Sequence, residues 1–235
     1  MTLQLEQLQK TSTLEWQVAQ GLIDDASAVD KFGYSPTVNN TAFETVWDGG
    51  VPYVYIASAG VASVASDESD DNGGTVEVQG LDANYQPVSE TITIGSTGTQ
   101  LFYRVFRASL VTAATGDVNQ GDVTITVDSK SAAIIRAEYG QTLMALYTIP
   151  RGKRGYLLQI DCGASKDLEH EIILRQKHNG GAWNTKTYVS MRGGFISKIN
   201  SVPIQIPAEA DIEIQAKASA TSAVGAGFEL ILVDD

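Results

Sequence analysis

The sequence has few of the side chains from which most catalytic and metal sites are built. Its 235 residues include one cysteine, Cys162, and two histidines. A zinc cluster or a Cys-His pair needs more ligands or partners than these, and a lone cysteine has no partner for an intrachain disulfide. We therefore expect packing and strand pairing to hold the fold. A single thiol also fits a reducing compartment, or an assembly made inside one.

Long apolar runs and an excess of basic charge are also missing. No 18 successive residues are apolar, and the start MTLQLEQLQK has neither a basic segment nor a continuous apolar run. We therefore expect no membrane partner and no secretory signal. The formal net charge of −12 disfavours a duplex nucleic-acid partner, because phosphates would be repelled.

The acidic charge is concentrated in the first part of the chain. Residues 1–130 carry 5 basic and 17 acidic side chains, whereas residues 131–235 carry 11 of each. This asymmetry indicates an acidic region joined to an electroneutral one. The acidic excess keeps an exposed domain soluble, or else it serves a cation or a basic partner.

Short alternating or apolar runs recur from residue 43 onward, separated by turn-forming Gly, Asp and Asn residues. The first series is 43–47, 51–56, 75–78, 88–94, 101–110, 123–127 and 132–137. The second series is 142–149, 156–160, 169–177, 186–191, 195–199, 204–206, 211–216 and 228–233. Such runs predict antiparallel sandwiches, and the eight runs of the second series suit a jelly roll. Asp82-Ala83-Asn84-Tyr85 is expected to turn a hairpin.

The first 30 residues allow two interpretations. Ser12 and Glu15 have the spacing of a helix capping box, and Leu14, Val18 and Leu22 would share one helical face. The segment 14–18 also alternates as a strand does, and Gly21 suits a helix poorly. We favour an extended arm that contains a strand. Such an arm adds a strand to a neighbouring copy, or it packs on its own domain.

The acidic loop 67–73 is a candidate for calcium, which prefers several oxygen ligands. It departs from the EF-hand pattern, because the glycine falls one place late and Val78 stands where the pattern needs Glu. A solvated loop tip is the favoured interpretation.

His170 lies in a segment that could suggest a zinc protease. The pattern H-E-x-x-H needs a second histidine where Leu174 stands, and the segment alternates as a strand does. On that strand, Glu169 and Glu171 share the face opposite His170. We expect a packed or edge histidine, not a catalytic one.

Hydrolase and nucleotide motifs are incomplete. The segment 163–167 lacks the second glycine of the nucleophile elbow around Ser165. No phosphate-binding loop is present, and Gly225-Ala226-Gly227 is too short for a dinucleotide fingerprint. No residue is therefore assigned a catalytic, cofactor-binding or metal-binding role, and no cofactor is expected.

Two loops between apolar runs could contact a partner. Arg151, Lys153 and Arg154 place three cations in four residues, which could meet an acidic partner or simply form a solvated turn. Trp183, in the loop 179–184, could stack on a sugar, although packing back onto the sheet is favoured.

Several longer strings of the sequence stand out: Lys31-Phe32-Gly33-Tyr34, FETVWDGG at 43–50, VQGLDANY at 78–85, SETIT at 89–93, FYRVFRA at 102–108, QTLMA at 141–145, YTIP at 147–150 and GYL at 155–157. These strings resemble a family of virion structural proteins from tailed bacteriophages of the aquatic or cyanophage type. The resemblance extends from about residue 31 to about residue 160. It implies a structural protein without an assigned catalytic activity, so no functional residue is transferred.

Together these features predict an all-β protein with an arm at 1–30, an acidic β-sandwich at 31–138 and a second, jelly-roll-like β-sandwich at 139–235. We expect a non-enzymatic capsid decoration or cement protein, located in the virion and assembled in the host cytoplasm. Its expected partners are further copies of itself in a homotrimer, and the major capsid protein or other virion proteins. The alternative is a tail, fibre or baseplate component that contacts the host surface.

Overall fold

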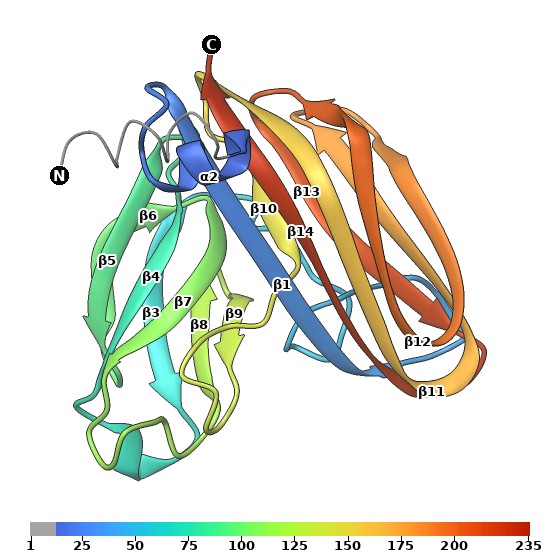
Figure 1. Cartoon of the computed structure of the whole chain (residues 1–235). Coiled ribbons are helices and arrows are strands. Elements are labelled where there is room, and N and C mark those ends of the chain that lie inside the picture. The colour runs from blue at the N-terminus through green and yellow to red at the C-terminus, as the bar shows by residue number, and fades with distance from the viewer. Residues whose placement is uncertain (1–12) are drawn as a thin grey trace, which may run out of the picture.

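The computed structural model describes residues 13–235, and nearly all of its regular structure is β (Figure 1). Two β-sandwiches lie side by side and contact each other through buried side chains. We call them the N-terminal sandwich, formed by β3–β9, and the C-terminal sandwich, formed by β1, β2 and β10–β14. Every strand pairing is antiparallel, so the predicted all-β class is confirmed.

The N-terminal sandwich packs a four-stranded sheet, ordered β6-β3-β8-β9, against a three-stranded sheet, ordered β5-β4-β7. Its strands are β3 (Gly60–Ser66), β4 (Thr75–Leu81), β5 (Pro87–Thr93), β6 (Thr97–Phe102), β7 (Arg104–Thr112), β8 (Val123–Val127) and β9 (Lys130–Ile135), with a 3-10 turn at Ser69–Asp71. The hairpin predicted at Asp82 joins β4 to β5. Inward side chains of both sheets form one core, as the period-2 alternation requires.

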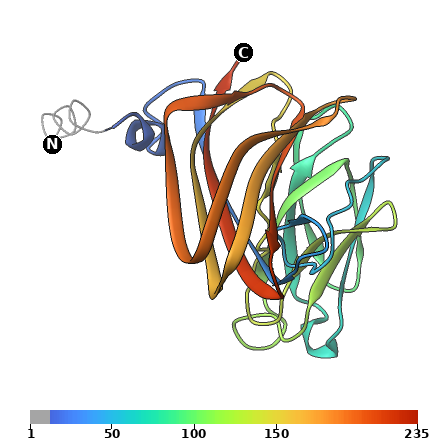
Figure 2. The ribbon, with the colours of Figure 1, turned by 90° about the vertical axis from the view of Figure 1, so that its right-hand side faces the viewer.

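The C-terminal sandwich is a seven-stranded sheet in which β1, β14, β11, β13 and β10 follow one another, β12 pairs with β11 and β2 pairs with β13. Its strands are β1 (Ala26–Val38), β2 (Glu44–Thr45), β10 (Leu146–Thr148), β11 (Lys153–His178), β12 (Trp183–Ile206), β13 (Ala210–Ala218) and β14 (Ser222–Asp234). The long β11–β12 hairpin curves around this sandwich (Figure 2).

This sheet folds over itself into two layers because β11 changes neighbours along its length. Residues 153–164 of β11 pair with β14, and residues 170–178 pair with β13, with a register shift between Ala164 and Glu169. Five separate runs were expected over 156–206, but the structure joins them into β11 and β12. The turn at 179–182 separates these two strands, and the other interruptions are bulges and bends within them, as at Gly193 and Gly194, which have φ of 61° and 75°.

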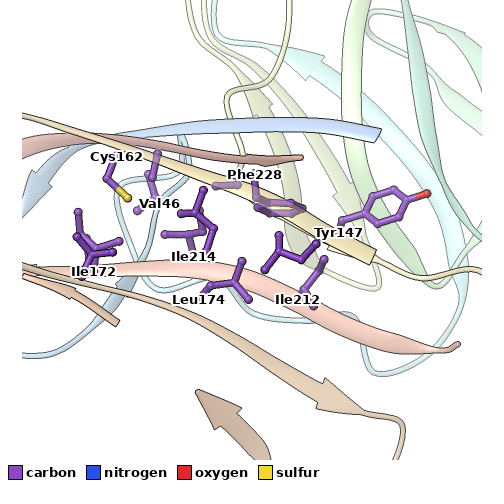
Figure 3. Close-up of a cluster of buried hydrophobic side chains, with 14 of the residues drawn as sticks. Val46, Tyr147, Cys162, Ile172, Leu174, Ile212, Ile214 and Phe228 are labelled. Atoms are coloured by element: carbon purple, nitrogen blue, oxygen red, sulfur yellow. The ribbon is translucent and has the colours of Figure 1, made fainter. Parts of the chain in front are cut away.

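The core of the C-terminal sandwich lies between these two layers (Figure 3). Cys162 and Phe228 point from one layer toward Leu174 and Ile214 of the other. All four are buried, and each large apolar side chain contributes roughly 1.5–3 kcal/mol by leaving water. Burial raises the pKa of the Cys162 thiol to about 12, so this cysteine is a packing residue.

The expected strand at 14–18 is wrong, because Leu14–Ala19 forms a helix, α2. Gly21, at φ 67°, donates its amide to the Val18 carbonyl, and the Leu22 amide bonds to Gln17. These two bonds form the glycine-terminated helix end known as a Schellman motif. The glycine that argued against a helix therefore ends it. Ser12, the other half of the expected capping box, lies outside the described residues.

Two further expectations in the first series need correction. The run 51–56 is not a strand: Pro52 has no amide hydrogen to pair, and the Val51 carbonyl accepts a bond of 2.5 Å from the Trp47 indole. The run 101–110 is divided at Tyr103 between β6 and β7, which belong to different sheets.

β1 lies across the expected boundary between the arm and the first domain. It pairs with β14 from Ala26 to Val38, so it completes a sheet of its own chain. The division at residues 30 and 138 stays a prediction, while the pairing places β1 and β2 with the C-terminal strands. No helix within residues 13–235 is long and apolar enough to span a membrane.

Candidate assembly surface

The most exposed apolar side chains of the C-terminal sandwich lie on one strand, β12. Phe195, Ile199 and Val202 are 69%, 73% and 80% exposed, and Tyr188 is 54% exposed. β12 pairs with β11 on one side, and no described strand pairs with its other side. A single exposed apolar residue is common, but four along one unpaired edge are typical of an association surface. We call these four side chains the β12 surface.

The rest of β12 limits how a partner can approach this edge. Lys198 interrupts the apolar row, and Pro203 removes a backbone donor. Gly193 and Gly194 bend the strand. Charge, proline and bends are the devices by which proteins prevent indiscriminate edge-to-edge pairing. The β12 surface therefore favours a defined partner over open-ended strand addition.

The opposite side of the β11–β12 hairpin holds it rigidly on the core. Val189 and Met191 of β12 are buried in the same cluster as Ile172 and Leu174 of β11. His170 is fully buried beside them, and its Nδ1 lies 2.7 Å from the Leu168 carbonyl oxygen. The expectation of a packed histidine is confirmed.

A buried ion pair joins the two sandwiches, and no sequence motif indicated it. Arg104, at the start of β7, donates to both carboxylate oxygens of Asp211 on β13 at 2.7 and 2.9 Å. Thr148 donates to the same carboxylate at 2.6 Å. The guanidinium lies 4.2 Å from the ring centre of Tyr103. A paired and stacked arginine at this depth positions one sandwich on the other.

A second buried carboxylate, Glu213, lies two residues further along β13. It accepts from Arg175 at 2.5 Å, from Thr45 at 3.1 Å and from Tyr55 at 3.3 Å. Burial raises the pKa of Glu213, and the Arg175 charge acts in the opposite direction. The Arg175 guanidinium lies 4.3 Å from the ring centre of Trp183. Trp183 therefore packs back onto the sheet, as expected, and contacts Arg175 and Tyr55.

Lys31 and Asp48 are two more buried ionisable groups near the contact between the two sandwiches, which we call the joint. The Lys31 amine donates to the Phe106 carbonyl of β7, and burial lowers the pKa of this lysine to about 7. Asp48 accepts the Leu143 amide at 2.5 Å through one oxygen, while its other oxygen has no partner. Burial raises the pKa of Asp48 to about 7. Burial therefore makes the charged form of each group less favourable in free energy than it is in water.

The acidic loop candidate is tied through Asp71 to the loop that precedes β8. Both carboxylate oxygens of Asp71 are engaged, by the Ser66 hydroxyl and by the amides of Gln120 and Gly121 at 2.6–2.9 Å. Within the described residues, no three His, Cys, Asp or Glu side chains are grouped so that they could hold a metal ion. The loop geometry therefore fits a structural turn of the N-terminal sandwich.

The basic loop does not point unpaired cations at a partner. Arg151 binds Glu209 at 2.6 Å, Arg154 binds Asp235 at 2.7 Å, and Lys153 binds Asp234. Ser165, the residue of the incomplete nucleophile elbow, is an exposed position on β11. Neither motif joins the buried groups of the joint.

Comparisons with known proteins give weak similarities. No family model matches the chain, and no curated protein matches it. A solved structure of infectious bursal disease virus, Gt strain, is 11% identical, with 90% of this chain and 73% of that chain covered and a TM-score of 0.23. The PBSX exported protein XepA is 10% identical, with 86% of each chain covered and a TM-score of 0.20. Scores this low bear on neither function nor partners.

Proposed function

We propose that this protein is a non-enzymatic virion component of a tailed bacteriophage, which decorates or cements the outer capsid as a homotrimer. The single observation that carries the proposal is the β12 surface on a rigid all-β frame. The resemblance of residues 31–160 to phage virion structural proteins supports the setting. Assembly in the host cytoplasm and residence in the virion belong to the same proposal.

The buried charges support a structural role because they are used within the chain. Arg104 pairs with Asp211 across the joint between the sandwiches, and Arg175 pairs with Glu213 within the C-terminal sandwich. The pair across the joint favours one arrangement of the two bodies, and this keeps the β12 surface in a fixed orientation. A fixed surface, repeated in several copies, converts weak contacts into stable attachment.

The proposed partner of the β12 surface is another copy of this chain. A subunit contact made by apolar side chains excludes water from both surfaces and closes the exposed strand edge. The nearly neutral C-terminal sandwich can approach its copies without the repulsion that the acidic N-terminal sandwich would cause. The N-terminal sandwich would then face solvent.

Oligomeric state tests this partner. We expect the purified protein to be a trimer by light scattering, and the pair Ile199→Thr and Val202→Thr to make it monomeric. The matched control is Leu101→Thr with Val111→Thr, which changes two side chains 54% and 55% exposed on the N-terminal sandwich. A monomeric unmodified protein, or equal effects of the two pairs, would contradict the proposal.

The number of copies in a purified particle tests the location. Hundreds of copies would support a capsid surface, because every repeated capsid site would be occupied. About 6 to 18 copies would instead identify a tail, fibre or baseplate component, since tails have small cyclic symmetries.

A further inference from the structure

A shallow groove of about 390 Å³ lies on the outer face of the layer formed by β1, β14, β11 and β12. Its floor follows the strand register. In one row Phe32 is level with Gly227 and Asp161, and in the next row Gly225 is level with Gly163. Phe195 of β12 continues the second row. Three strand spacings, roughly 14 Å, separate the aromatic residues at its two sides.

Two of the floor glycines have no explanation in the fold of this chain. A Cβ on Gly227 would lie 2.7 Å from the Lys31 carbonyl oxygen, so packing requires this glycine. A Cβ on Gly225 or Gly163 would meet nothing closer than 3.7 Å, and neither residue has a positive φ. Glycine inside a strand weakens the strand, and it often marks a place where another backbone approaches closely.

Carboxylates give the groove a negative field. Asp30 and Glu229 are paired residues of β1 and β14, and Asp161 lies beside them on β11. Burial, followed by the charges of Asp30, Asp161 and Glu15, raises the pKa of Glu229. Among residues 13–235, no salt bridge engages any of these four carboxylates. A cation in the groove would relieve this repulsion.

The side chains around these acids favour an organic cation. The side-chain amide of Gln159 lies 3.0 Å from both oxygens of Asp161 and holds this carboxylate in place. Phe32 and Phe195 are 37% and 69% exposed, and an exposed aromatic ring can contact the aliphatic stem or the charged head of a long side chain.

We infer that this groove binds an extended, lysine- or arginine-bearing segment of a partner protein. The segment's backbone lies on the glycine floor, its cations face Asp161 and Glu229, and its aliphatic stems pack between the phenyl rings. Phe195 and Ile199 of β12 project from the same face as the groove, because they pair with Gly163 and Gln159 of β11. Phe195 forms one side of the groove, whereas Ile199 and Val202 lie outside its lining.

A labelled peptide, acetyl-Lys-Gly-Lys-Gly-Lys-amide, tests the inference by fluorescence anisotropy with the full chain. We expect binding that weakens with salt, and at least tenfold weaker binding when Asp161→Asn is combined with Glu229→Gln. Gly225→Val, which fills the floor, should block binding without removing charge. Circular dichroism verifies its fold, and Gly163→Ala is the smaller replacement should Gly225→Val not fold.

The control variant carries Glu68→Gln and Asp70→Asn, which remove two exposed charges from the N-terminal sandwich. Its peptide affinity should stay within twofold of the unmodified protein. Equal weakening by the control would overturn the inference, because net charge alone would then explain the binding. A second peptide, in which each Lys is replaced by Glu, should not bind, and equal binding of the two peptides would overturn the inference. Salt-independent binding of the sugar maltotriose at the groove would overturn it too.

These outcomes are separable from those of the proposed function. The variant with Ile199→Thr and Val202→Thr keeps every carboxylate and glycine of the groove. It should bind the peptide normally even where it no longer forms trimers, so either proposal can fail alone.

Discussion

The two sandwiches share one class of fold but differ in what they leave exposed. The strands of the N-terminal sandwich have 5–9 residues, and residues 48–138 carry four basic and twelve acidic side chains. The C-terminal sandwich has strands of up to 26 residues, and residues 139–235 carry ten charges of each sign. The short strands close a charged, self-contained body. The long ones leave an apolar edge, which is what assembly requires.

The joint between them differs from both exposed surfaces, because it contains a buried pair of opposite charges. Arg104 from the N-terminal sandwich meets Asp211 from the C-terminal one. Two bodies with such different surfaces would be expected to move independently unless the contact between them were specific. The buried pair supplies this specificity, and its removal is the most severe test of the comparison.

Asp211→Asn should have the largest effect. It leaves the Arg104 charge buried without its partner, and breaking a buried pair costs about 3 kcal/mol or more. We expect the free energy of unfolding to fall by that amount in urea and the two sandwiches to unfold in separate transitions. Glu209→Gln, which breaks the more exposed pair with Arg151, should cost much less, because solvent screens an exposed pair. Similar losses in both variants would show that the joint pair is not special.

Lys31→Met should change the pH dependence of stability above neutrality. The folded pKa is about 7 and the ordinary value is 10.5, so between these pH values the unfolded chain holds a proton that the folded chain lacks. Stability should therefore rise with pH, by about 1.4 kcal/mol per unit from this group. Methionine should remove the rise and stabilise the protein at pH 6. A pH profile unaffected by the substitution would show that the amine is solvated.

The Asp48 carboxyl should make stability fall with rising pH, whereas Lys31 makes it rise, and it should do so at lower pH. Asp48→Asn should remove this fall. The folded pKa is about 7 against an ordinary 3.8, so the folded chain holds the extra proton between these values. The free energy of unfolding should therefore fall as pH rises from about 4 to 7, and Asp48 should cause no further loss above pH 7. Relative to the unmodified protein, the variant should gain stability over this range. A constant difference between the two thermal melting curves across pH would contradict this.

The sequence predicts the β frame well because alternation and turn residues are local signals. It predicts the joint poorly. Arg104 and Asp211 are 107 residues apart, and each lies in a segment that looks like an ordinary strand. The β12 surface was equally hidden: exposed and buried apolar residues look alike until the neighbours of a strand are known. At α2, the misleading signal was Gly21, whose role as a helix end depends on backbone conformation.

Removing charge from the N-terminal sandwich should have the smallest effect. Glu68 and Asp70 lie on the exposed acidic loop and form no salt bridge among residues 13–235. Replacing both by Gln and Asn should change the free energy of unfolding by less than about 0.5 kcal/mol and leave the oligomeric state unchanged. The expected consequence is slightly lower solubility at neutral pH, because removing two of the carboxylates behind the net charge of −12 leaves less like-charge repulsion between molecules. If these substitutions instead disrupted the oligomer in light scattering, the acidic sandwich would take part in assembly, and the division of roles between the two sandwiches would be wrong.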